Sequence, residues 1–268
     1  RLLIMHLNVK FKVITQSQQI TLIKRLITAN DFDLDAKKVL NFINAKKDKG
    51  LRAIESEDVF EQVYLAYQLH CKAHRLMDFG ELMLRCYELF QAYPRLLAHY
   101  QHKFNYVLVD EFQDTNWIQY EFLRLLTQEK GNLFIVGDDD QSIYGFRGAI
   151  VENMMTYQSH YQQHDLIKLE QNYRCSQTIL SAANHLIAHN HERLGKVLRT
   201  DNAIGDKITI YQASDAQREA EYIAGCISQL QAQGHALQDI AVLYRANSQA
   251  DLLAQTLMEG QIPFHVAR

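Results

Sequence analysis

The chain has 268 residues, of which 47% are hydrophobic, and a formal net charge of −3. It contains no apolar run of about 18 residues and its first residues lack the apolar core of a signal peptide, which argues against a membrane span and favours a cytoplasmic protein with no membrane partner. The four cysteines are far apart and form no Cys-x-x-Cys pair, so neither a disulfide framework nor a zinc site is expected.

In the first part of the chain, residues 1–104, the stretch from Ser17 to about Tyr100 is predicted to be helical nearly throughout. Apolar residues recur at helical spacing, for example at Ile20, Ile23 and Ile27, and Pro94 is the only proline in this part. The segment carries 16 Lys and Arg against 11 Asp and Glu, which is compatible with a polyanion partner and equally with a solvated lysine face. We expect an all-helical subdomain here.

The pattern changes after residue 105, where short apolar runs begin to alternate with helical stretches. Tyr106–Val109 and Leu133–Val136 are continuous β-prone runs, typical of parallel strands that are covered on both faces. The first run leads into Asp110 and Glu111, and the second into the polar segment 137–141. Because ligands bind at the carboxyl ends of the strands in open α/β sheets, both strand ends are expected to converge on one site.

The same alternation continues to the end of the chain. Further strands are expected at 166–169, 208–211 and 240–244, and helices over about 216–233 and 248–259. The sequence therefore divides into the helical part, an α/β segment over 105–170 and a second α/β unit over 171–268.

Asp110 and Glu111 are the first candidate site residues. An acidic pair at a strand end is often only a solvated turn. At a sheet edge, however, one carboxylate can hold Mg²⁺ through water while its neighbour orients and deprotonates an attacking water. Residues 105–170 carry 11 Asp and Glu against 4 Lys and Arg, so carboxylates gather here. These are two of the parts that nucleotide hydrolysis requires.

The segment 137–148 combines an acidic loop with an aromatic and basic run. Gln141 is placed to sense a terminal phosphate. Tyr144 and Phe146 are suited to stacking on unpaired bases, with Arg147 on the nucleic-acid backbone. The alternative is that both aromatic side chains are core residues beneath a loop.

Arg174 follows the last run of the first α/β segment and is a candidate charge clamp for a γ-phosphate, although an isolated arginine is usually a surface residue. One expected part is absent from the sequence. No Gly-x-x-x-x-Gly-Lys-Ser/Thr loop, which would cradle the phosphates, is present, and the only Gly-Lys pair, Gly195–Lys196, is followed by Val197.

Four linked motifs resemble superfamily 1 DNA helicases of the UvrD/Rep/PcrA kind. They occur in the family's order and spacing: VLVDEFQDTN (107–116), IVGDDDQSIYGFRGA (135–149), LEQNYR (169–174) and VLYRANSQA (242–250). The segments 77–85 and 179–196 also have the family's look, so the resemblance covers the whole chain.

The resemblance implies α/β, RecA-like motor domains of the P-loop NTPase type, with ATP between them and helical insertions, that move 3′ to 5′ on single-stranded DNA and act at single/double-strand junctions. By this resemblance the site residues take the following roles: Asp110 for Mg²⁺, Glu111 as catalytic base, Gln141 at the γ-phosphate, Arg174 as arginine finger, Tyr173 near the adenine, and Tyr144, Phe146 and Arg147 on DNA. DNA-repair proteins are implied as further partners.

The chain departs from the family pattern in two residues, since Phe146 stands in place of the usual tryptophan and Cys175 in place of the usual serine. The family's phosphate-binding loop is expected before Arg1 and the rest of the second motor domain after Arg268. Residues 1–104 would then be the insertion of the first motor domain, 105–170 its second half, and 171–268 the first part of the second. The chain alone is expected to lack ATPase activity.

Two alternatives remain open on the sequence. The parent protein can be a helicase-nuclease subunit of the recombination type, which would continue into a nuclease domain. The chain can also be an ATP-independent fragment that binds single-stranded DNA, in which case binding depends on salt and on Tyr144 and Phe146.

Overall fold

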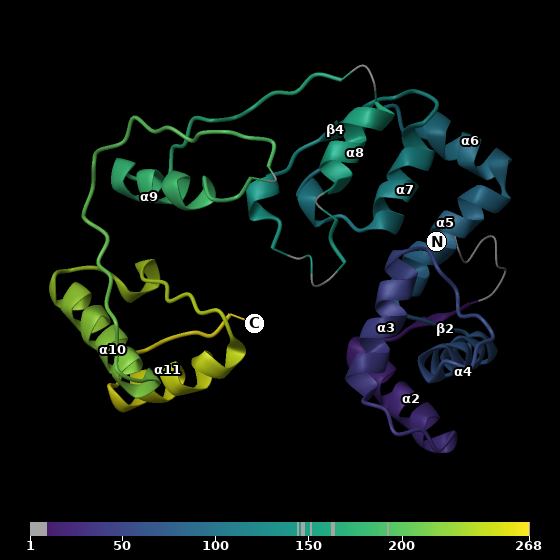
Figure 1. The fold of residues 1–268 in the computed structure, drawn as a ribbon, viewed down its shortest axis with the longest axis horizontal. Coiled ribbons are helices and arrows are strands. Elements are labelled where there is room, and N and C mark those ends of the chain that lie inside the picture. Colours follow the sequence, from purple (N-terminus) through teal and green to yellow (C-terminus); the bar gives the residue numbers. More distant parts are fainter. Residues whose placement is uncertain are drawn as a thin grey trace. The chain divides into compact units, whose positions relative to one another are not determined.

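The computed structural model describes residues 10–143, 145, 148–150, 152–161, 164–191 and 193–267. The chain forms two compact units (Figure 1). Unit 1 consists of Arg1–Gln171 and Asn184–Leu198, and unit 2 consists of Asn172–Ala183 and Arg199–Arg268.

The first part of unit 1 is a helical bundle that packs around one apolar core. Its fully buried members include Ile23, Val39, Ile43 and Val63. The helices begin where the sequence supplies a side-chain cap, as at Asp35, whose carboxylate accepts the backbone N–H groups of two following residues. The helices are α2 (Gln16–Ala29), α3 (Ala36–Asp48), α4 (Val59–Ala73), α5 (Phe79–Ala92) and α6 (Pro94–Lys103).

Residues 1–104 are not purely helical, which corrects one expectation. Two short strands, β1 (Lys12–Val13) and β2 (Leu76–Met77), pair in parallel, with Lys12 opposite Leu76 and Val13 opposite Met77. Each strand has only two residues, which is too few for an alternation of apolar and polar residues to be recognised in the sequence. The rest of the helical prediction is confirmed.

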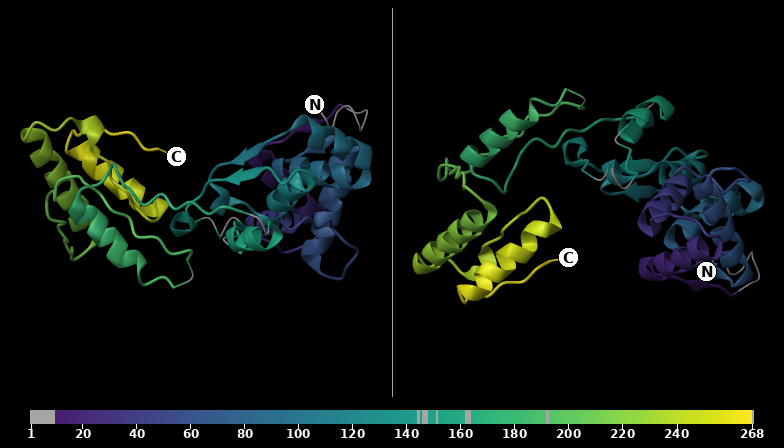
Figure 2. Two further views of the ribbon diagram at one scale, coloured as in Figure 1. Left: turned by 90° about the horizontal axis from the view of Figure 1, so that it is seen from above. Right: turned by 60° about the horizontal axis from the view of Figure 1, so that its bottom comes forward.

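The second part of unit 1 is built on a parallel pair of strands. β3 (Val107–Val109) lies beside β4 (Leu133–Ile135), and Val107 is opposite Leu133 (Figure 2). A 3-10 turn η1 (Phe112–Asp114) and helix α7 (Trp117–Thr127) connect them. After β4 come the 3-10 turn η2 (Asp139–Gln141) and helix α8 (Glu152–His160). Both predicted strands are therefore confirmed, and both run in the same direction. The expected cover on both faces is not found, because Leu108 is 73% exposed and Phe134 is 59% exposed.

Helix α7 ties the strand pair to the helical bundle. Its N-cap is Asn116, and Gln119 completes a capping box. On one side the ring of Phe122 stacks on Phe90 of α5 at a centroid distance of 5.3 Å. On another side of α7, the ring of Tyr120 stacks on the ring of His160 in α8. The two parts of unit 1 thus share aromatic contacts.

Unit 2 contains helix pair α10 (Ala216–Ala232) and α11 (Asn247–Glu259), with the 3-10 turn η4 (Leu237–Asp239) between them (Figure 1). Ile227, Leu257 and Ile262 form its buried cluster. Helix α9 (Gln177–Ile187) begins in unit 2, and its residues from Asn184 onward are assigned to unit 1. Both helices that the sequence predicts after residue 207 are confirmed.

The strands expected at 166–169, 208–211 and 240–244 are not formed. Ile210 is 92% exposed and Leu243 is 95% exposed. A strand needs a neighbour for its backbone hydrogen bonds, and among the described residues these segments have no ladder partner. Ile240 and Val242 still pack against the helices of unit 2, while Leu243 faces outward. The side chains therefore alternate as in a strand, although the backbone forms no strand hydrogen bonds among the described residues.

Two further observations bear on the expectations from composition. Within the described part of the chain, no helix is both long and apolar enough to cross a membrane. The four cysteines are free thiols, and Cys71 is buried.

Candidate functional site

The carboxyl ends of β3 and β4 meet at one edge, as predicted. The pairing continues one residue beyond the strands, since Val136 N–H donates to Val109 O at 2.8 Å and Phe112 N–H donates to Val136 O at 3.0 Å. Asp110 and Glu111 follow β3, and the loop with Gln141 follows β4. The structure therefore brings together three of the predicted site residues, Asp110, Glu111 and Gln141.

Glu111 has a left-handed backbone conformation, with φ of 50°. Such a conformation is uncommon outside glycine and tends to occur at functional sites. Its backbone N–H donates to Asp110 Oδ1 at 2.9 Å, and its Oε2 accepts a hydrogen bond of 2.7 Å from Gln113 Nε2. Both carboxylates are exposed, so they are accessible to water and to a ligand.

The turn that carries these residues is buttressed by α8. Asn153 is 5% exposed, and its Nδ2 donates to Thr115 O at 3.0 Å. Ile150 N–H donates to the same carbonyl oxygen at 3.0 Å. The chain after β4 therefore fixes the turn that follows β3.

The loop after β4 is held by a cluster of charges. Lys196 Nζ pairs with Asp138 and lies 3.3 Å from Asp139 and 3.1 Å from Asp140. Arg193 pairs with Asp140, with 2.8 Å between Nε and Oδ1. Two cations thus neutralise most of the charge of three carboxylates.

The pKa values of this cluster move in the directions that favour charge. Burial raises the pKa of Asp140, but hydrogen bonds from Arg193 and Lys196 outweigh it and hold that pKa below its usual value. Burial lowers the pKa of Lys196, and the hydrogen bonds to Asp138 and Asp140 reverse this and raise it. The ion pairs therefore persist at neutral pH.

Two groups of carboxylates at this edge could hold a divalent cation. Ligand oxygens of Asp138, Asp139 and Asp140 lie within 4.8 Å of one another, but Lys196 and Arg193 already pair with them. Asp110 has no ion pair among the described residues, and it is exposed. Hard oxygen ligands with access to water suit Mg²⁺, so Asp110 fits this ion better than the paired aspartates do.

Two predicted residues, Tyr173 and Arg174, belong to unit 2. They lie in a turn in which Asn172 Oδ1 accepts the backbone N–H groups of Arg174 at 3.0 Å and of Cys175 at 2.8 Å. Tyr173 is 84% exposed, and Arg174 is exposed as well. Both side chains are therefore available to a ligand. The predicted DNA-contact residues Tyr144, Phe146 and Arg147 lie outside the described residues.

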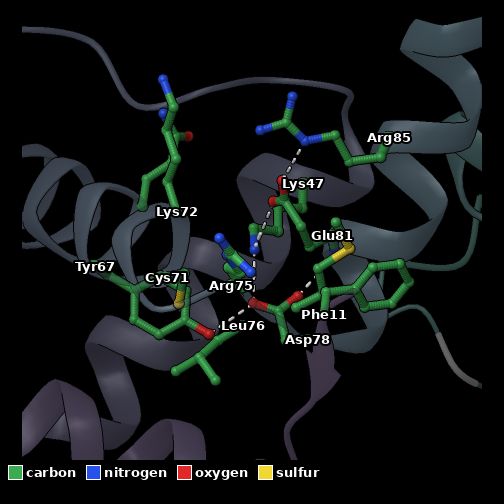
Figure 3. A pocket seen from close by; sticks show the side chains of 12 residues that line it. Phe11, Lys47, Tyr67, Cys71, Lys72, Arg75, Leu76, Asp78, Glu81 and Arg85 are labelled. Atoms are coloured by element: carbon green, nitrogen blue, oxygen red, sulfur yellow. Dashed lines mark hydrogen bonds and ion pairs between the residues drawn. The ribbon is translucent and has the colours of Figure 1, made fainter. Parts of the chain in front are cut away.

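A cavity of about 260 Å³ lies in the helical part of unit 1 (Figure 3). Asp78 is one of its lining residues and accepts hydrogen bonds of 2.6 Å from both Lys47 Nζ and Tyr67 Oη. None of its lining residues follows β3 or β4. Because Asp78 also caps α5, the ion pair and the cap explain these charges as part of the fold.

The sequence reasoning missed three residues of the site, Gln113, Arg193 and Lys196. Gln113 lies inside the motif that contains Asp110 and Glu111, so its position next to them was a usable signal. Arg193 and Lys196 follow their acidic partners by more than 50 residues, and no local pattern pairs them.

Two family models match the chain. The UvrD/REP helicase N-terminal domain matches residues 3–162, and the UvrD-like helicase C-terminal domain matches residues 167–268. The chain belongs to the UvrD/Rep helicase family. Membership implies a RecA-like α/β fold, with which the parallel pair of β3 and β4 is consistent.

Similar proteins include DNA helicase II of Haemophilus influenzae, 43% identical over 266 residues, and DNA helicase II of Escherichia coli, 44% identical over 266 residues. The ATP-dependent DNA helicase PcrA of Leuconostoc citreum is 41% identical over 268 residues. These alignments cover 96%, 96% and 95% of this chain, respectively, and 36%, 37% and 36% of the relatives. The chain thus spans little more than a third of the length of these relatives.

Proposed function

We propose that the full-length protein containing this chain is an ATP-dependent DNA helicase that moves 3′ to 5′ along single-stranded DNA and acts at single/double-strand junctions. The observation that carries the proposal is the meeting of Asp110, Glu111 and Gln141 at the ends of two parallel strands. This is the place where α/β sheets bind ligands, and these residue types suit phosphoryl transfer to water.

The three residues at the strand ends take distinct roles in this proposal. Asp110 holds Mg²⁺ through water, and the ion offsets the negative charge of the ATP phosphates when bound. Glu111 orients the attacking water and accepts its proton. Gln141 meets the γ-phosphate, and its own side chain donates to Asp138 Oδ2 at 2.8 Å, which fixes its starting position.

The other predicted residues contact the nucleotide and the DNA. Arg174 acts as the arginine finger on the γ-phosphate, and Tyr173 lies near the adenine. Tyr144, Phe146 and Arg147 bind single-stranded DNA by stacking and by charge. The exposure of Tyr173 and Arg174 supports this assignment.

The proposed domain organisation and location in the cell are as follows. Residues 1–104 are the insertion of a first motor domain, 105–170 are the second half of that domain, and 171–268 begin a second motor domain. The protein works in the cytoplasm and meets DNA-repair proteins. Residues 1–268 alone have negligible ATPase activity, because their sequence has no Gly-x-x-x-x-Gly-Lys-Ser/Thr loop.

The test is Glu111→Gln in the full-length protein. The amide keeps the size of the side chain but cannot accept a proton, so DNA-stimulated ATP hydrolysis should fall by roughly 100-fold or more while ATP still binds. Hydrolysis is followed by phosphate release and binding by a fluorescent ATP analogue. A near-normal rate would remove Glu111 from the role of base.

Strand separation on a duplex with a 3′ single-stranded tail, set against one with a 5′ tail, tests the polarity. Unwinding from the 5′ tail alone would contradict the proposed direction.

Salt-dependent binding of single-stranded DNA by the full-length protein, with neither ATP hydrolysis nor unwinding, would favour the ATP-independent binding function instead.

A further inference from the structure

Gln113 joins the two halves of the candidate site. It lies in η1 and is 1% exposed. Its Nε2 donates to Glu111 Oε2 at 2.7 Å, and its Oε1 accepts the backbone N–H of Asp138 at 3.0 Å. One end of this amide therefore holds a residue that follows β3, and the other end holds a residue that follows β4.

The chemistry of the two partners requires an amide between them. A carboxylate such as that of Glu111 only accepts hydrogen bonds, and the backbone N–H of Asp138 only donates one. The orientation of the Gln113 amide follows from its partners, because the reversed amide would face an acceptor with its oxygen and a donor with its nitrogen. Neither a carboxylate nor an apolar side chain can make both hydrogen bonds.

The backbone of Gly137 lies close to the amide group of Gln113. A Cβ atom at Gly137 would lie 2.7 Å from Gln113 Oε1, well inside van der Waals contact. The link then continues beyond Asp138, whose carboxylate accepts from Gln141 Nε2 at 2.8 Å and pairs with Lys196. A chain of hydrogen bonds thus runs from Glu111 through Gln113 and Asp138 to Gln141.

We propose that Gln113 is a positioning residue for ATP hydrolysis. It fixes the Glu111 carboxylate relative to the loop that carries Gln141, so that the water held by Glu111 and the phosphate met by Gln141 are aligned. A glutamate side chain has three rotatable bonds, and among the described residues Gln113 is the hydrogen-bond donor that holds the Glu111 carboxylate. The inference rests on the proposed roles of Glu111 and Gln141.

The experiment measures DNA-stimulated ATP hydrolysis by the full-length protein carrying Gln113→Met or Gln113→Glu. Methionine keeps the length of the side chain and makes neither hydrogen bond, whereas glutamate retains only the acceptor for Asp138. Because misplacing a catalytic group slows the chemical step, kcat should fall roughly 10- to 100-fold in both variants, with KM for ATP changed less than about threefold.

The matched control is Gln101→Met. Gln101 is 6% exposed, and its Nε2 donates to Leu125 O at 2.8 Å, so its loss also removes a buried hydrogen bond in unit 1. This variant should lose stability but keep kcat within about twofold of the wild type. A similar fall in kcat for Gln101→Met and Gln113→Met would show that the effect is merely structural, and would overturn the inference.

A double-mutant cycle separates this inference from the proposed function. If Gln113 acts through Glu111, Gln113→Met should lower kcat in the wild type and leave the residual rate of Glu111→Gln unchanged. An equal factor in both backgrounds, or a wild-type kcat for Gln113→Met beside an inactive Glu111→Gln, overturns the inference alone. A near-normal rate for Glu111→Gln overturns the assignment of the base itself.

Discussion

Arg193 donates a hydrogen bond from Nε to Asp140 Oδ1 across 2.8 Å, which attaches the segment after α9 to the loop after β4. The attachment has further points, because Leu194 N–H donates to Asp139 Oδ2 at 2.6 Å and Lys196 pairs with all three aspartates. The loop that leads to Gln141 is therefore fixed from two directions, by this segment and by Gln113.

The first prediction concerns this cluster. Lys196→Gln should lower the free energy of unfolding of unit 1 by about 1–2 kcal/mol, because three carboxylates that lie close together lose a partly buried cation. Urea unfolding followed by the fluorescence of Trp117, the single tryptophan and a residue of unit 1, measures this.

Arg124→Gln is the matched control for Lys196→Gln within unit 1. Arg124 pairs with Glu121 at 2.7 Å one turn away on α7, and its side chain is 39% exposed, so this change should stay within about 0.5 kcal/mol. Equal effects of the two substitutions would mean that the cluster around Lys196 is only a surface charge arrangement.

The sequence predicts those features of the site that local pattern determines. Val107–Val109 could be recognised because its apolar run ends abruptly in acids, and Asn116 could be recognised as a helix cap. The partners of Asp138 could not be predicted, since Gln113 and Lys196 reach it from 25 and 58 residues away in the chain. The run 208–211 has strand residues, but a strand also depends on a hydrogen-bonding neighbour, which sequence periodicity does not provide.

The second prediction concerns the ion pair of Lys47 and Asp78, whose side chains are each 2% exposed and 2.6 Å apart (Figure 3). Lys47→Met leaves the buried carboxylate with the hydroxyl of Tyr67 but without its cation. The free energy of unfolding should therefore fall by about 3–5 kcal/mol, again measured through Trp117 fluorescence in urea.

Adding Asp78→Asn to Lys47→Met tests the cause of that loss. In Asp78→Asn the Oδ1 atom still caps α5 and the Nδ2 group can donate to the hydroxyl oxygen of Tyr67. The asparagine carries no charge, so the double variant should regain at least half of the lost stability. No recovery would mean that the packing of the Lys47 side chain matters more than the buried charge.

The third prediction is a pH dependence at Asp48. Burial raises the pKa of Asp48 to about 6, although a hydrogen bond from Asn116 opposes the shift. Because the pKa of Asp48 is higher in the folded protein than the ordinary value of 3.8, its contribution to the stability of the fold is fully present below pH 3.8. This contribution is lost as the pH rises through 6. Asp48→Asn should therefore stabilise the protein at pH 7 by about 1 kcal/mol, discounted for partial exposure.

The gain from Asp48→Asn should disappear near pH 4, where the wild-type carboxyl is protonated in the folded protein. Urea unfolding at pH 4, 5, 6 and 7, with wild type and variant side by side, gives the difference at each pH. A difference that is constant over this range would exclude ionisation of Asp48 as its cause.

The last prediction concerns Gly137, which faces the Gln113 amide. A methyl group there would lie 2.7 Å from Gln113 Oε1 and 3.3 Å from the backbone nitrogen of Phe112. The amide cannot move aside without breaking its hydrogen bond to Glu111 or Asp138, because Gln113 is buried. Gly137→Ala should therefore lower kcat for ATP hydrolysis by the full-length protein roughly tenfold and its free energy of unfolding by about 1–3 kcal/mol.

Gly225→Ala provides the control for Gly137→Ala. Gly225 lies in α10, and a Cβ added there meets no atom within 4 Å apart from its chain neighbours and the backbone of its own helix. Alanine should therefore leave kcat unchanged and add up to about 1 kcal/mol of stability as a better helix former. If Gly137→Ala kept the wild-type kcat, the Gln113 amide would tolerate displacement, and the alignment of Glu111 with the loop after β4 would not depend on that contact.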